Sequence, residues 1–178
     1  MKIQLFFREK EKDPLLEDLS SLMYDFELLY NFCLVTNSKK YADYNFPQGF
    51  WYRKGRGISD EDKLRTSKII KESPLSIELL IAATPAALGA VWLLIQAIEK
   101  VYNMELEHRK KALKIKKLKL EIQKLENQKL EKEAMKKDLE EVLKKPQNQR
   151  TFRFIYRRLE TSTIKLEDFE FAIDDAEP

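Results

Sequence analysis

One long stretch, from Thr84 to Lys145, constrains this chain more than any other feature. No glycine or proline occurs between Ala90 and Lys145, and Pro85 and Pro146 bracket the stretch. Because these two residue types disfavour helix interiors, the stretch is predicted to form one very long helix or a pair of helices. A straight helix of this length would extend roughly 90 Å.

Such a length leaves two arrangements open for the end of the chain. In the first, the stretch folds back as a helical hairpin, with Asn103 and Asn127 near the weakest points for a bend. In the second, the C-terminal segment lies elsewhere or pairs with another chain. A single straight helix is incompatible with a return of the C-terminal residues to the same sheet.

The first third of the stretch is almost purely apolar and admits two interpretations. The run 79–98 holds no charged residue, and its length is sufficient to cross a bilayer. The cations of 109–119 follow it, where cytoplasmic positive charge is expected. However, Thr84-Pro85 is typical of a helix start, and only about 21 Å of helix remains from there to Ile98. A core helix is favoured; the alternative is a single-pass inner-membrane anchor with a cytoplasmic C-terminal part.

The remaining two thirds of the stretch are highly charged and contain fragments of a heptad pattern. Glutamates precede lysine or arginine by four residues, as in Glu105/Arg109 and Glu140/Lys144, and each such pair stabilises a helix by roughly 0.2–0.5 kcal/mol. Lysines occupy the seam in the middle, so the register fails there. We expect a partly coiled-coil projection, with an oligomer or partner interface formed by Ile115, Leu118, Ile122, Leu125, Leu139 and Val142.

The rest of the chain alternates strand and helix patterns. Strict alternation indicates strands with one buried face, and apolar residues at three- and four-residue steps indicate an amphipathic helix. The predicted elements are a strand at 2–8, a helix at 14–35, a long aromatic and basic loop at 36–62, strands at 64–71 and 75–82, the long helix, and a C-terminal hairpin of strands at 151–159 and 163–171.

The order β-α-β-β-α-β predicts an α+β fold: a ferredoxin-like sheet domain with a very long, partly coiled-coil second helix and a C-terminal β-hairpin. Three parts follow from this prediction. They are a small α/β domain at 1–103, a charged helical projection at 104–145, and the hairpin with an acidic tail at 146–178.

Three basic segments, 51–56, 109–119 and 150–158, are candidates for contacts with phosphates. Cations interleaved with aromatic rings are typical of proteins that bind single-stranded nucleic acid. Solvated helix and strand faces are the more common explanation, and the acidic run 60–62 weakens the case for the first segment. The candidate contacts are Arg53, Lys54, Arg56, Lys110, Lys114, Lys117, Arg153 and Arg157.

The sequence contains little that indicates catalysis. His108 is the only histidine and Cys33 the only cysteine, so a histidine-activated nucleophile and a zinc site both lack the usual residues. Glycine-rich nucleotide motifs are missing as well. We expect no enzymatic activity, no metal, no cofactor and no small-molecule substrate, and we expect Cys33 to be buried and inert.

The strand–Ser73-Pro74-Leu75–strand arrangement, the alanine-rich helix and the Glu/Lys/Leu-rich helix together resemble a group of small uncharacterised bacterial proteins. The resemblance covers roughly 64–130. Some members lie in defence or conflict gene neighbourhoods, so the resemblance implies a bacterial, cytoplasmic setting. It carries over no functional residue.

Three functional hypotheses follow from these patterns. The first is a non-enzymatic assembly protein that forms homo-oligomers or docks a protein partner through its long helix, within a bacterial defence or conflict system. The second is a membrane-anchored effector with 79–98 inserted in the bilayer. The third is a nucleic-acid-binding accessory protein that uses the three basic segments.

Overall fold

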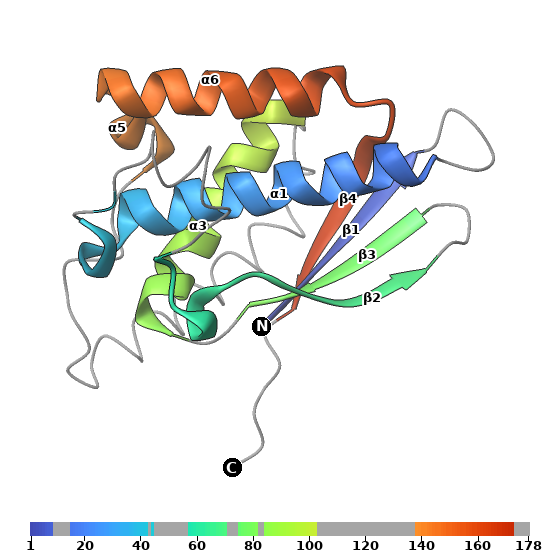
Figure 1. Ribbon diagram of the computed structural model, residues 1–178, viewed down its shortest axis with the longest axis horizontal. Coiled ribbons are helices and arrows are strands. Elements are labelled where there is room, and N and C mark those ends of the chain that lie inside the picture. The colour runs from blue at the N-terminus through green and yellow to red at the C-terminus, as the bar shows by residue number, and fades with distance from the viewer. Residues whose placement is uncertain are drawn as a thin grey trace, which may run out of the picture.

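The computed structural model describes residues 1–8, 15–42, 44, 57–70, 75–81, 84–102 and 138–172. They form a mixed α+β fold with a four-stranded antiparallel sheet and helices packed beside it (Figure 1). The elements are β1 (Lys2–Arg8), α1 (Leu16–Asn37), the short helices η1 (Lys39–Tyr41) and η2 (Asp60–Asp62), β2 (Arg65–Ile70), β3 (Leu75–Leu80), α3 (Pro85–Tyr102), α5 (Leu139–Leu143), α6 (Pro146–Thr161) and β4 (Lys165–Ala172).

The sheet has the strand order β2-β3-β1-β4, and each neighbouring pair is antiparallel. In the central strand β1, Ile3, Leu5 and Phe7 are buried while the residues between them are less so. This is the alternation expected when one face of a sheet packs on the core. The edge strand β2 has an irregularity between Thr66 and Lys68, and it is exposed over most of its length.

Helix α1 joins the sheet to the other helices. The Phe26 ring meets the Phe7 ring of β1 edge to face, with their centroids 5.8 Å apart. On another side of α1, Phe32 contacts Phe152 of α6 with a centroid separation of 5.7 Å. Figure 1 shows α6 running alongside α1, with α3 crossing behind them. One core therefore extends from the sheet through α1 to α3 and α6.

The prediction of a strand at 151–159 is wrong, because these residues belong to α6. Phe152, Ile155 and Leu159 are buried on one side of this helix at steps of three and four residues, which is the spacing of a helix face. Of the three alternating aromatic residues, Phe152 belongs to that side, whereas Phe154 and Tyr156 are only partly buried. The predicted C-terminal hairpin is wrong as well, since only β4 of that region joins the sheet.

The long stretch does not continue as one straight helix. The Leu139 N–H donates a hydrogen bond to Gln96 Oε1 over 2.8 Å, and Lys100 pairs with Glu140. Along a straight helix, positions 96 and 139 would lie about 65 Å apart. The chain therefore returns to α3, which excludes a single straight helix, while the predicted helical hairpin falls on residues outside the described ones. The proposed bend points, Asn103 and Asn127, lie outside the described residues.

The uncharged run 79–98 is divided between two elements. Its first two residues end β3, and most of the remainder lies in α3, which begins at Pro85. The hydroxyl of Thr84 accepts a hydrogen bond from the Ala87 N–H over 3.1 Å, which caps the helix start as predicted. Among the residues that the structure describes, no helix combines the length and the apolar content that a bilayer span needs.

Candidate functional site

An apolar groove of about 460 Å³ lies between the N-terminal half of α1 and the edge strand β2. We call it the α1–β2 groove. Leu5 of β1 and Ile77 and Leu79 of β3 form its floor. One wall is formed by α1 and includes Leu16, Leu19, Leu22, Met23 and Phe26. The other includes Thr66 and Ile69 of β2 and Leu64, which directly precedes this strand.

Exposed apolar side chains concentrate at this groove. Leu16 is 82% exposed and Ile69 is 45% exposed, and both line the groove; the neighbouring Leu15 is 64% exposed. Within the described part of the chain, Leu15, Leu16 and Ile69 are the large hydrophobic residues that are exposed. Single exposed apolar residues are common on protein surfaces, whereas a contiguous apolar patch marks an interaction site.

The α1–β2 groove is an apolar strip with little charge. Of the described residues that line it, Glu27 of α1 is the charged one. Lys68 of β2 lies opposite Glu78 of β3, whereas Ile69 lies opposite Ile77, and both isoleucines line the groove. Because neighbouring residues of a strand point to opposite faces, Lys68 is directed away from the groove.

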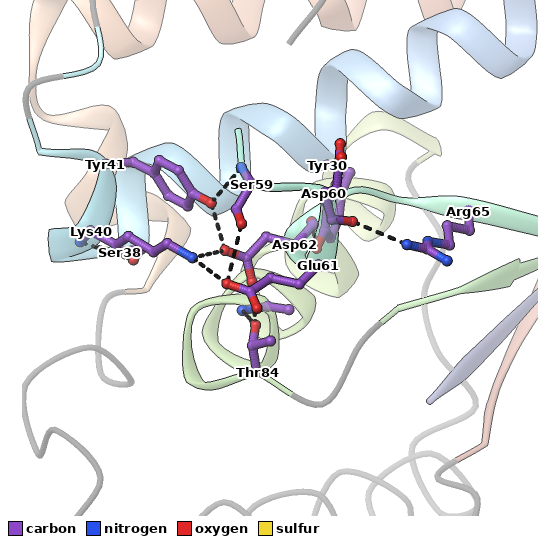
Figure 2. Close-up of polar contacts among 11 residues, drawn as sticks. Tyr30, Ser38, Lys40, Tyr41, Ser59, Asp60, Glu61, Asp62, Arg65 and Thr84 are labelled. Carbon is purple, nitrogen blue, oxygen red and sulfur yellow. Dashed lines mark hydrogen bonds and ion pairs between the residues drawn. The ribbon is translucent and has the colours of Figure 1, made fainter. Parts of the chain in front are cut away.

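A buried polar network centred on Asp62 lies where β2 begins (Figure 2). The Asp62 carboxylate accepts hydrogen bonds from the Tyr41 hydroxyl at 2.5 Å, the Lys40 ammonium at 2.8 Å and the Thr84 hydroxyl at 2.5 Å. Its backbone carbonyl accepts another from the Tyr30 hydroxyl at 2.7 Å. The Asp62 side chain has no exposed surface. Lys40 and Tyr41 belong to η1, Tyr30 belongs to α1 and Thr84 directly precedes α3, so the network ties α1, η1, η2 and α3 together.

The ionisation of the network follows from these contacts. Burial alone would raise the pKa of Asp62, but hydrogen bonds from Lys40, Thr84 and Tyr41 outweigh it and hold the pKa below its usual range. The hydrogen bond to Asp62 raises the pKa of Lys40. Burial raises the pKa of Tyr30 and of Tyr41. Asp62 and Lys40 are thus an ion pair at neutral pH.

This network supports the groove but offers no chemistry of its own. Both carboxylate oxygens of Asp62 are engaged and inaccessible, so neither can act on a substrate as a base or nucleophile. Asp62 stands three residues before Arg65, the first residue of β2. Its anchoring of this segment to α1 therefore fixes where β2 stands relative to α1.

A second ion pair attaches α6 to α1. The Arg158 Nε donates to Asp25 Oδ1 at 2.5 Å, and the guanidinium lies over the rings of Tyr24 and Phe154 at 5.8 Å and 5.7 Å. Burial raises the pKa of Asp25, although the bond to Arg158 offsets part of this effect. The side chain of Asp25 is only 4% exposed, so this pair holds two helices in register.

The residues proposed from the sequence fall into three groups. Leu139 and Val142, proposed for an interface, are buried in the core of their own chain. Arg153 and Arg157 are exposed on α6. The others lie outside the described residues: Ile115, Leu118, Ile122, Leu125, Arg53, Lys54, Arg56, Lys110, Lys114 and Lys117.

Sequence reasoning singles out neither the groove nor Asp62. A signal for Asp62 does exist, because Tyr30 and Tyr41 lie in apolar surroundings, and buried phenol groups require hydrogen-bond partners. The groove gives no comparable signal, because Leu16 and Ile69 fit the patterns of an ordinary helix and strand. Only the packing shows that nothing in the described structure covers them.

No cluster of three or more histidine, cysteine, aspartate or glutamate residues suited to a metal ion occurs in the described structure. Comparisons with protein-family models, curated proteins and solved structures find no match to this chain.

Proposed function

We propose that this protein is a non-enzymatic assembly protein whose chains pair through the α1–β2 groove. The observation that carries the proposal is the concentration of exposed Leu15, Leu16 and Ile69 at one apolar groove. Removing apolar surface from water is favourable by about 25 cal/mol per Å², so a second copy that covers this groove gains stability. The groove volume of about 460 Å³ lies in the roughly 300–1,000 Å³ range of sites that bury a ligand.

A second copy of the chain is the occupant that we propose for the groove. Around a two-fold axis, α1 of one chain meets β2 of the other, and the same contact occurs twice. Each exposed Leu16 then enters the opposite groove, so one arrangement covers the exposed apolar side chains of both chains.

Direct pairing of the two β2 edges is disfavoured in this proposal. The irregularity between Thr66 and Lys68 interrupts the regular ladder, and the exposed Lys68 places charge on the edge. Bulges and edge lysines are features that prevent strand-to-strand association. The contact proposed here therefore uses side chains of the groove and does not extend the sheet.

The arrangement of the sheet also supports a proposal about the fold. We infer a ferredoxin-like sheet elaborated by two further helices, α5 and α6, between α3 and β4. What supports this inference is the central β1, flanked by antiparallel β3 and β4, together with helical connections after β1 and after β3. The predicted coiled-coil residues between Ile115 and Leu125 would add a second contact between chains.

The mass of the purified chain in solution tests the assembly proposal. Light scattering coupled to gel filtration should give twice the chain mass of 21.2 kDa at concentrations above the dissociation constant. The double variant Leu16→Glu/Ile69→Glu should be monomeric, because it places charge in the apolar strip. Both residues are exposed, so the fold should be retained, with an unchanged far-ultraviolet circular dichroism spectrum. Gln147→Glu, on the exposed side of α6, adds charge elsewhere and is the control.

Two results would contradict the assembly proposal. One is a wild-type chain that remains monomeric at roughly 100 μM, where a dissociation constant of 1 μM predicts a dimer. The other is a Leu16→Glu/Ile69→Glu variant that keeps its fold and forms the dimer as well as the wild type does.

A further inference from the structure

A second concave surface, separate from the α1–β2 groove, lies along α6. It has a volume of about 530 Å³ and is lined by residues of α3, α5 and α6. We call it the α6 groove. Of its charged residues, Lys100 and Glu140 pair with each other, so their charges largely cancel. Lys144, Arg153 and Arg157 remain, with Glu160 as the remaining acidic residue.

The cations of the α6 groove are available to a ligand. Lys144, Arg153 and Arg157 are exposed, and none of them forms an ion pair within the described part of the chain. Arg153 and Arg157 are one helical turn apart, so their side chains emerge on the same side of α6. Arg150 is exposed one turn before Arg153 and extends this cationic row along the helix.

Aromatic rings lie within the same groove. Phe152 and Tyr156 both line it, and their centroids are 6.5 Å apart. Phe152 is buried in the core, whereas Tyr156 is only half-buried and presents part of its ring to the groove. Phe152 therefore supports the ring that a ligand can reach.

We propose that the α6 groove binds single-stranded nucleic acid. Lys144, Arg153 and Arg157 contact phosphates, and the ring of Tyr156 stacks on a base. A groove that combines a row of cations with a partly exposed ring is typical of proteins that bind single strands with little sequence preference. The concave shape argues against an acidic membrane surface, which presents a flat layer of charge to a protein. The proposal does not depend on dimerisation through the α1–β2 groove.

Fluorescence anisotropy with a labelled oligo-dT of about 15 nucleotides, near the upper end of known site sizes, tests this proposal. Binding by the full chain should weaken as salt increases. Arg153→Gln/Arg157→Gln should weaken it further and reduce the slope of log K against log salt by about 1.4, since each single-strand phosphate contact contributes about 0.7. Tyr156→Leu should weaken binding by about 5- to 150-fold, and Tyr156→Phe, which retains the ring, should bind nearly as the wild type.

The matched control is Arg8→Gln/Lys63→Gln, which removes two cations from outside the α6 groove. Arg8 and Lys63 are exposed and form surface ion pairs with Glu167 and Asp60. The affinity of this control variant for the oligonucleotide should stay near the wild-type value. Circular dichroism spectra of all variants check that the fold is retained.

Three results would overturn the proposal. One is no binding of the oligonucleotide by the wild-type chain at low salt. Another is an equal loss of affinity in the control and in Arg153→Gln/Arg157→Gln. The last is binding to vesicles of acidic phospholipid without binding to the oligonucleotide. The mass of the same samples by light scattering shows separately whether the chains pair, so failure of one proposal is distinguishable from failure of the other.

Discussion

Replacing Asp62 by asparagine should remove a large part of the stability of this fold. The carboxylate accepts hydrogen bonds from Tyr41, Lys40 and Thr84, and bonds to a charged group are each worth about 1.5–3 kcal/mol. Lys40 is 46% exposed and regains water when the charge is lost, so its share is small. Tyr41 is only 5% exposed, and its hydroxyl loses a strong acceptor.

The expected cost of Asp62→Asn is therefore about 3 kcal/mol, out of the roughly 5–15 kcal/mol that a domain of this kind has in total. Urea unfolding followed by circular dichroism measures this loss of stability. The slope of the unfolding free energy against urea concentration should be the same in the variant and the wild type, which shows that both expose the same surface on unfolding. Glu61→Gln is the matched control, because Glu61 also contacts Lys40 but is exposed. It should leave the unfolding midpoint nearly unchanged.

A double-mutant cycle shows whether the loss comes from the network. Tyr41→Phe removes the buried hydroxyl, so its cost should be much smaller in the Asp62→Asn background than in the wild type. If Asp62→Asn shifts the midpoint no more than Glu61→Gln does, the buried network does not hold the segment before β2. Additive effects of Tyr41→Phe and Asp62→Asn would also refute the reasoning.

Three further predictions concern pH, thiol reactivity and packing. The folded pKa of Asp62 lies below its ordinary value of 3.8. The free energy that the ionised carboxylate adds to folding is therefore present above that pH and is lost as the pH falls through the folded pKa. Unfolding free energies measured at decreasing pH should show this loss in the wild type and not in Asp62→Asn. Cys33 has no exposed surface, and burial raises its pKa, so iodoacetamide should alkylate it only in denaturant, as mass spectrometry can show. Ala90 is fully buried in α3, and Ala90→Leu should cost about 1–3 kcal/mol by overpacking, measurable as a lower urea midpoint; an unchanged midpoint would show that space exists beside it.

Local patterns predict most of the sheet and the first helix. The structure confirms the strand at 2–8, the helix after it, and the strands near 64–71 and 75–82. In β1 and along α1 the apolar period matches the face that is buried, so local pattern and tertiary packing agree. The start of α3 is predictable for a similar reason, because Thr84 supplies a cap and Pro85 a fixed backbone angle.

The end of the chain shows where such patterns become ambiguous. Residues 152, 154 and 156 are aromatic, which suggests a strand, while residues 152, 155 and 159 are apolar, which suggests a helix. Both periods fit a window this short. Burial of the second set against α1 decides in favour of the helix, and that contact joins residues more than 100 positions apart in the sequence.

The residues of the candidate sites are harder to predict from the sequence than the helices and strands. Asp62 lies in an acidic run that has the composition of a solvated loop, and only the meeting of α1, η1 and α3 around it makes it a buried acceptor. The α1–β2 groove likewise depends on how far β2 stands from α1. Arg153 and Arg157 were named from the sequence as phosphate contacts. Residues four apart share a side in a strand as well as in a helix, so both arginines lie on one side although the predicted strand is helix α6.

Because the chain returns to α3, residues 103–137 are inserted between two neighbouring parts of the fold, α3 and α5. Gln96 and Leu139 are hydrogen bonded, so Tyr102 and Asp138 lie within about 15 Å of each other, given 1.5 Å of helix per residue. A linker of about six residues spans that distance. The sheet and helices that the structure describes are therefore joined across this gap by their own contacts, which such a linker would leave in place.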